Sequence, residues 1–231
     1  MNRRTFIFLT VGIVVLAVGV GGWMLSRSKS PVDSALDDVR RLPLVGPVMA
    51  ENPTVESRMR AAIEEEIRSP TQSGPSRPFL LVADLRRQYI VPALRSADDA
   101  SAVAAVAARA DLVRHLRRAD TAACRQFALG AFQRPDLLDT EGQRLFGEVL
   151  HKLEAAWRSG KAGKPQPVMT REEVMAALGQ AGFGKADFDR LSGFQTLSND
   201  LTCDVELKID SAPPLLPADK RGPFARAILG T

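Results

Sequence analysis

Side chains that commonly carry catalysis are scarce in this chain. Its 231 residues include 2 histidines, 2 cysteines and 1 tyrosine. A metal site built on His115 and His151 would need further ligands at matched spacing, and neither an HxxxH nor an HExxH pattern occurs. We therefore expect both histidines to lie on helix surfaces, His115 among arginines and His151 beside Glu148 and Glu154, and we predict no metal site.

The sequence also lacks the short motifs of the common enzyme classes. It has no GxSxG, no Walker loop, no GxGxxG after a strand, no CxxC and no EF-hand loop. We predict no cofactor and no catalytic residue, and a binding role is favoured over catalysis. Glu64, Glu65 and Glu66 keep one alternative open, an envelope enzyme that cleaves peptidoglycan with paired carboxylates. The simpler interpretation is a solvated helix face.

Charge is nearly balanced, with a net charge of +4 and 25% charged residues. A nucleic-acid partner would require a clustered basic face. The nearest candidate is interrupted by Asp111 and Asp120 and consists of Arg109, Arg114, Arg117 and Arg118. We expect no nucleic-acid partner, while attraction of these arginines to anionic lipid headgroups stays open.

One long apolar run stands at the N-terminus. It extends from Thr5 to Leu25 without a charged residue, and a helix needs about 20 apolar residues to cross a bilayer core. Trp23, near its end, suits the headgroup layer. The sequence predicts a transmembrane signal anchor with bilayer-facing positions at Thr5, Phe6, Ile7, Leu9, Ile13, Leu16, Trp23 and Leu25.

Two other interpretations of this run remain. A cleaved secretory signal would be shorter and end in small residues of the A-x-A type, which Gly19–Gly21 matches poorly. The stretch Asn2–Ile7 resembles the twin-arginine family of bacterial export signals. That resemblance covers only these residues and implies export by the corresponding route.

Positive charge predicts the orientation of the anchor. Arg3 and Arg4 directly precede the run and favour a cytoplasmic N-terminus. A simple count of the positive charges after the run favours the opposite orientation, because Arg27, Lys29, Arg40 and Arg41 lie there. We predict a single-pass protein of a bacterial inner membrane with a periplasmic C-terminal domain. A cytoplasm-facing domain that binds acidic partners is the alternative.

The chain after the anchor is predicted to be all-α. Residues 1–25 form the anchor, 26–53 a polar stalk and an extended, proline-rich lead-in, and 54–231 a multi-helix domain with a possible subdivision at 160–169. Apolar residues at four-residue spacing and N-terminal capping residues predict the following helices: 54–67, capped by Thr54; 79–94, kinked or ended by Pro92; 97–118; one from 120 or 121, ended by Pro135; 140–160, with a Thr140–Gln143 capping box; 171–181, with a Thr170–Glu173 capping box; and 185–191.

The segment 201–209 is ambiguous. Its apolar residues alternate as in a strand, but Leu201, Val205 and Ile209 also share a helical face and Ser198 can cap it. No convincing partner strand exists, so we predict a helix. A last helix is expected after Pro217, broken or delayed at Gly222–Pro223.

Cys124 and Cys203 lie in apolar-patterned segments far apart in the sequence. Two cysteines in an exported domain predict one disulfide, and two buried thiols are the alternative. The sequence thus describes a membrane-anchored binding or scaffold subunit that contacts the lipid bilayer and another envelope protein.

Overall fold

The computed structural model describes residues 30–230, and every regular element among them is helical. The predicted all-α class is therefore confirmed for this part of the chain. No helix within it is long and apolar enough to cross a membrane. The predicted anchor at 5–25 lies outside the described residues. The chain forms two compact units, and the boundary between them in the sequence lies between Arg87 and Gln88.

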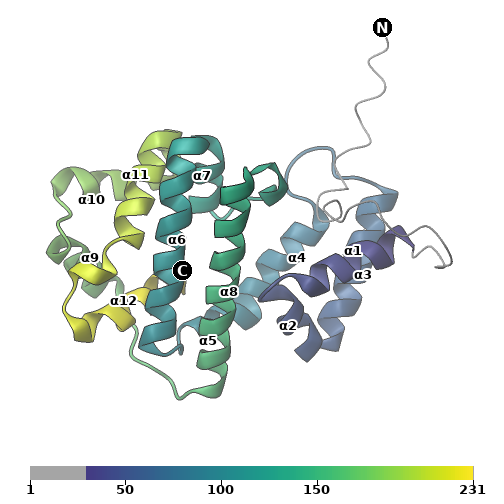
Figure 1. Ribbon diagram of the computed structural model, residues 1–231, viewed down its shortest axis with the longest axis horizontal. Coiled ribbons are helices and arrows are strands. Elements are labelled where there is room, and N and C mark those ends of the chain that lie inside the picture. The colour runs from purple at the N-terminus through teal and green to yellow at the C-terminus, as the bar shows by residue number, and fades with distance from the viewer. Residues whose placement is uncertain (1–29, 231) are drawn as a thin grey trace, which may run out of the picture. The chain divides into compact units, whose positions relative to one another are not determined.

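The first unit contains α1 (Pro31–Arg41), α2 (Val45–Glu51), α3 (Pro53–Arg68) and α4 (Arg77–Leu85) (Figure 1). The prediction of a stalk and an extended lead-in over 26–53 was wrong for α1 and α2. Prolines here begin helices: Pro31 and Pro53 stand in first turns, where a missing N–H costs nothing. The same geometry corrects the predicted cap at Thr54, because α3 begins at Pro53 after Asn52.

Apolar stripes hold the first unit together. The four-residue spacing predicts one buried stripe of Val55, Met59, Ile63 and Ile67 in α3, and this was correct for the first three but wrong for Ile67, which is 37% exposed. Leu44, Val48 and Met49 are buried as well. Leu44 adopts a positive φ of 67°, which makes the sharp link between α1 and α2.

Residues 79–94 do not form one regular helix. A π-helical turn over Arg86–Ile90 follows α4, and α5 (Val91–Leu94) comes next. Pro92 has no N–H to donate to the preceding turn, and a widened turn absorbs that loss.

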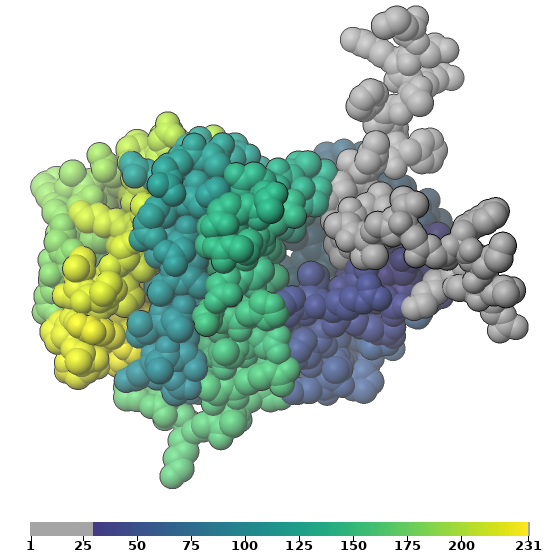
Figure 2. Space-filling view, viewed as in Figure 1, coloured from purple at the N-terminus to yellow at the C-terminus, as the bar shows by residue number. Residues whose placement is uncertain are grey.

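The second unit is organised around α6 (Asp99–Ala119). The remaining helices of this unit are α7 (Thr121–Ala128), α8 (Thr140–Ala162), α9 (Arg171–Gln180), α10 (Lys185–Ser192), α11 (Asn199–Asp210) and α12 (Ala218–Leu229). Helix α6 packs against α8 on one side and against α11 and α12 on the other. Figure 2 shows α8 and α12 flanking α6 on the surface of this unit. Buried alanines, including Ala102 and Ala105, let these neighbours approach closely.

Several predicted boundaries in this unit were correct. Asp120 caps α7 and Ser198 caps α11, so the helix predicted at 201–209 is confirmed. The capping box of α9 is present, since Thr170 Oγ1 accepts from the Glu173 N–H and the Glu173 carboxylate accepts from the Thr170 N–H.

Other boundaries differ from the prediction. Helix α8 is capped by Asp139, not by a Thr140–Gln143 box, and continues through Gly160. Helix α7 ends before Gly130, whose φ of 67° turns the chain well ahead of Pro135. The start of α8 and the end of α7 both follow from local signals, since the Asp139 carboxylate accepts the Gly142 N–H and Gly130 adopts the positive φ common after a helix.

Helix α12 continues through Gly222 and Pro223, where a break or delay was expected. Its buried Arg226 donates to the carbonyls of Ala97 and Pro167 and to the Asp99 carboxylate. These bonds hold α12 against the start of α6 and offset the missing proline donor.

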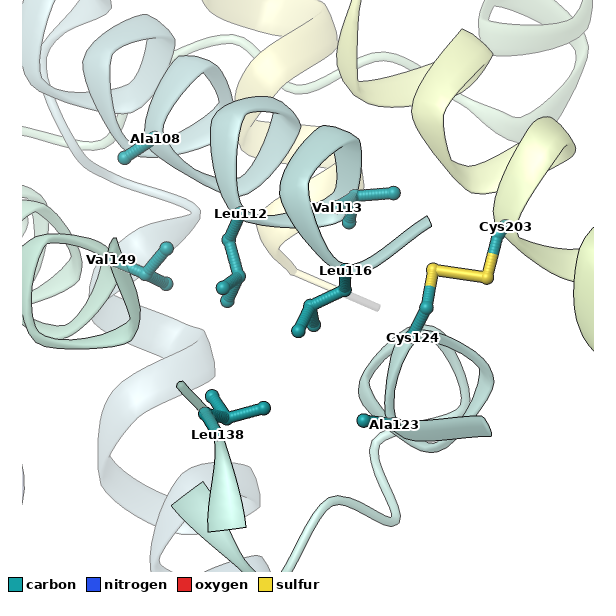
Figure 3. Close-up of a cluster of buried hydrophobic side chains, with 9 residues drawn as sticks. All are labelled: Ala108, Leu112, Val113, Leu116, Ala123, Cys124, Leu138, Val149 and Cys203. Carbon is teal, nitrogen blue, oxygen red and sulfur yellow. A yellow bond between two sulfur atoms is a disulfide. The ribbon is translucent and has the colours of Figure 1, made fainter. Parts of the chain in front are cut away.

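The two cysteines form the predicted disulfide. Cys124 on α7 and Cys203 on α11 are fully buried, with their Cα atoms 5.9 Å apart, inside the range that a disulfide requires. Figure 3 shows the sulfur–sulfur bond beside Val113 and Leu116 of α6. The bridge joins two helices that both pack on α6.

Candidate binding site

His115 and Asp139 form a polar pair at the surface of the second unit. His115 projects from α6, and its Nε2 lies 2.8 Å from Asp139 Oδ1. The same oxygen accepts the Gly142 N–H as the N-cap of α8. His115 was expected among arginines on an open helix face. Its side chain is instead only 17% exposed, because the segment before α8 folds over it.

A small pocket lies beside this pair. Its volume is about 210 Å³, and its walls are His115, Leu116, Ala119, Asp120, Leu137, Leu138 and Asp139. Asp120 and Asp139 both cap helices, with the Asp120 Oδ1 accepting from the N–H groups of Ala122 and Ala123. The Gly142 N–H and the His115 ring hold the pKa of Asp139 below its usual value. The pocket therefore combines apolar walls with negative charge.

Leu137 stands exposed at the edge of this pocket. It belongs to the 3₁₀ turn Pro135–Leu137 and is 69% exposed, the most exposed of the large apolar side chains in the described residues. Its neighbour Leu138 is buried and points toward Leu116 (Figure 3). Of these two consecutive leucines, Leu137 is therefore exposed to solvent and Leu138 packs in the core.

The carboxylates whose pKa is raised lie elsewhere. Glu206 and Asp210 on α11 are 6% and 1% exposed, and both meet Arg109 of α6. Burial, together with the neighbouring Asp210, raises the pKa of Glu206 to about 7. Neither this pocket nor the one described next is lined by Glu206 or Asp210, so the geometry expected of a peptidoglycan-cleaving carboxylate is not found there.

A second pocket lies within the first unit. It has a volume of about 380 Å³ and is lined by Met49, Ala50, Pro53, Glu56, Ser57 and Arg60. Its charged residues are engaged, because Arg60 pairs with Asp33 at 2.8 Å and Glu56 pairs with Arg40. The bond from Arg40 holds the pKa of Glu56 below its usual value. These ion pairs leave little free charge for a ligand.

Glu66, one of the three glutamates considered for catalysis, has a structural role in the first unit. Glu66 is buried, where a solvated face was expected, and it accepts bonds from the N–H groups of Thr71 and Arg77, the Thr71 hydroxyl and the Arg77 guanidinium. Burial alone would raise the pKa of Glu66, but these donors lower it below its usual value. Glu66 anchors the loop between α3 and α4.

Sequence reasoning missed the cluster of Arg109, Glu206 and Asp210. The buried face of α11 carries Thr202, Cys203, Val205, Glu206 and Asp210, whereas Leu201, Leu207 and Ile209 are only partly buried. The sequence signal for this cluster was Glu206 and Asp210, two acidic residues four positions apart on the same helical face as Cys203. The prediction for this segment rested instead on the apolar alternation and on the presence of two cysteines in the chain.

Comparison of the chain with family models, curated proteins and solved structures found no match. Among residues 30–230, no group of three or more histidine, cysteine, aspartate or glutamate side chains is arranged to hold a metal ion.

Proposed function

We propose that this chain is a membrane-anchored binding subunit whose second unit docks to another protein of the bacterial envelope. The observation that carries the proposal is Leu137, 69% exposed at the rim of a pocket that contains two aspartates. A concave site with apolar walls and a few polar groups can hold a side chain of a partner, and Leu137 extends the apolar surface at its rim. The apolar run at 5–25 supports an anchor, and the disulfide supports an oxidising compartment.

The chemistry of the pocket suggests what the partner presents. Leu116, Ala119 and Leu138 suit an aliphatic chain, and the carboxylates of Asp120 and Asp139 suit a positive charge at its end. A lysine or arginine side chain combines both properties. The partner is therefore a protein that inserts such a side chain next to Leu137.

Site-specific photo-crosslinking in intact cells tests the docking surface. A photoreactive amino acid replaces Leu137 in one strain and Leu215 in another. Leu215 is a matched control because it is also on a proline-containing 3₁₀ turn and is 63% exposed. We expect one discrete adduct from position 137 and none from position 215. No adduct at 137, or equal adducts at both positions, would refute the docking surface.

A charge variant tests the chemistry of the pocket. Asn caps helices as well as Asp does, so Asp139→Asn removes the charge while keeping the start of α8. Asp98→Asn is its control, since Asp98 caps α6 in the same manner and does not line the pocket. Asp139→Asn should weaken the crosslink at position 137, and Asp98→Asn should leave it unchanged. An unaffected crosslink in both variants would argue against a cationic partner.

A further inference from the structure

Two carboxylates share one guanidinium in the interior of the second unit. Arg109 Nη2 bonds to Glu206, and Arg109 Nε lies 3.3 Å from Asp210 Oδ1. Glu206 and Asp210 are one helical turn apart on α11 and face α6. The other oxygen of Asp210, Oδ2, is buried and has no hydrogen-bond partner among the described residues.

The other charged groups around α11 are engaged elsewhere. Lys208 bonds to Asp187 of α10 and to the Gly182 carbonyl. Arg117 of α6 pairs with Asp204. Arg125 of α7 donates to the carbonyls of Gln195 and Leu197. Arg109 is thus the cation that meets both buried carboxylates, and its guanidinium also lies 5.3 Å from the centre of the Phe127 ring.

This arrangement leaves one negative charge too many. If all three groups were ionised, the cluster would carry a net charge of −1 in a largely buried site, where the side chains of Glu206 and Asp210 are 8% and 0% exposed. Burying an uncompensated charge is costly, and a buried acid responds by taking up a proton. The single bound proton makes the cluster neutral and gives one carboxyl a hydroxyl.

We propose that the cluster of Arg109, Glu206 and Asp210 is a proton-binding site. One proton, bound by one of the two carboxyls, neutralises the cluster and completes the packing of α11 on α6, and its loss loosens the C-terminal half of α11. The disulfide limits the loosening, because Cys203 ties the preceding turn of α11 to α7. Glu206 and Asp210 lie beyond that tie.

The direction of the pH effect follows from proton linkage. The pKa of Glu206 is about 7 in the folded protein against 4.5 for a free glutamate. Between these values the folded state holds a proton that the unfolded state has released. The free energy of unfolding therefore falls as pH rises from about 4.5 to about 7. Over this range the unfolding equilibrium constant grows by up to ~10-fold per pH unit, and above it the effect levels off.

Denaturant unfolding of the full-length chain in mild detergent, from pH 5 to pH 8, tests this site. Glu206→Gln keeps the size of the side chain and an oxygen for Arg109, and it removes the excess carboxylate. Asp210→Asn does the same at the second position. The control is Asp204→Asn on the same helix, which removes a surface carboxylate 37% exposed.

The expected result is a difference in slope between the variants. Relative to Glu206→Gln or Asp210→Asn, the unfolding constant of the wild type should rise by up to ~10-fold per pH unit below pH 7. Asp204→Asn should follow the wild type. Parallel curves for the wild type and both cluster variants would overturn the proposal.

A measurement on the wild type alone covers the case in which neither cluster variant folds. Infrared difference spectroscopy detects the C=O stretch of a protonated carboxyl, and exposed carboxyls are ionised at pH 6. We expect this band at pH 6 and its loss by pH 8, with faster hydrogen exchange in residues 206–210 at pH 8 than at pH 6 after correction for intrinsic rates. A missing band at pH 6 would overturn the proposal.

Discussion

Gly160 of α8 lies directly against the backbone carbonyl of Ala93 in α5, so closely that a Cβ at position 160 would overlap the Ala93 oxygen. The glycine is buried in the last turns of a long helix, a place where glycine costs helix stability. Its lack of a side chain is what lets α5 and α8 pack. Trp157 strengthens the same contact, since its indole N–H donates to the Tyr89 carbonyl at 3.1 Å.

Alanine substitutions in α8 should therefore have opposite effects at two glycines. Gly160→Ala should destabilise the protein by ~1–3 kcal/mol, because the added methyl forces α5 and α8 apart. Gly147→Ala in the same helix meets open space and should stabilise it by ~0.5–1 kcal/mol. Urea unfolding of the full-length chain in mild detergent measures both. Equal effects of the two substitutions would contradict the close approach.

Removal of the disulfide should be costly. Replacing both Cys124 and Cys203 by alanine should lower the free energy of unfolding by ~2–5 kcal/mol, because the unfolded chain regains the freedom of a long loop. Alanine is preferred to serine, since a hydroxyl at these fully buried positions would add its own penalty.

Mass spectrometry without reductant checks the bridge directly in protein from the native cell. We expect no alkylated cysteine before reduction and two afterwards. Free alkylation of both thiols in unreduced protein would show that the bridge does not form in the native compartment, and it would count against export.

Glu66 should stabilise the first unit in a pH-dependent manner. Glu66→Ala should lower the free energy of unfolding by ~1–3 kcal/mol, because it leaves the N–H groups of Thr71 and Arg77 without their acceptor. The pKa of Glu66 is lowered in the folded state, so its contribution is present above the usual value of 4.5 and is lost as pH falls through the folded value.

Unfolding at pH 7 and at pH 3 measures this effect, with Glu64→Ala as the control from the same run of glutamates. The difference in free energy of unfolding between Glu66→Ala and the wild type should be smaller at pH 3 than at pH 7. Glu64→Ala should stay within ~0.5 kcal/mol of the wild type at both pH values. A gap of the same size at both pH values would argue against an ionised anchor.

The predicted topology is open to a protease test. Because Arg3 and Arg4 abut the apolar run, protease added to spheroplasts should digest the domain without lysis. Digestion only after lysis would reverse the orientation. A native N-terminus near Trp23 would instead indicate a cleaved signal.

Features that depend on neighbours in the sequence could be predicted. The helix over Asn199–Asp210 and the Thr170–Glu173 capping box follow from hydrogen bonds that span three or four residues. The pairing of Cys124 with Cys203 followed from their number, since two cysteines permit only one intrachain bridge. Local periodicity also indicated the all-helical class.

The candidate binding site could not be predicted from residues that are neighbours in the sequence. His115 and Asp139 are 24 residues apart, and their contact depends on how the connection between α7 and α8 folds back over α6. Gly130 and Pro135 set local turns in that connection, but no pattern in its residues indicates that it covers His115. The exposure of Leu137 and the burial of Leu138 are decided by the same path.

The sequence by itself determined the helical class, most helix starts and the cysteine pair, because short-range hydrogen bonds and periodicity are encoded in adjacent residues. Only the tertiary structure decided that Arg109 meets Glu206 across 97 residues and that Gly160 admits a neighbouring backbone. Both are effects of burial. The electrostatic cost of a charge and the volume allowed to a side chain are set by whatever packs around them, and in this chain those neighbours are far away in the sequence.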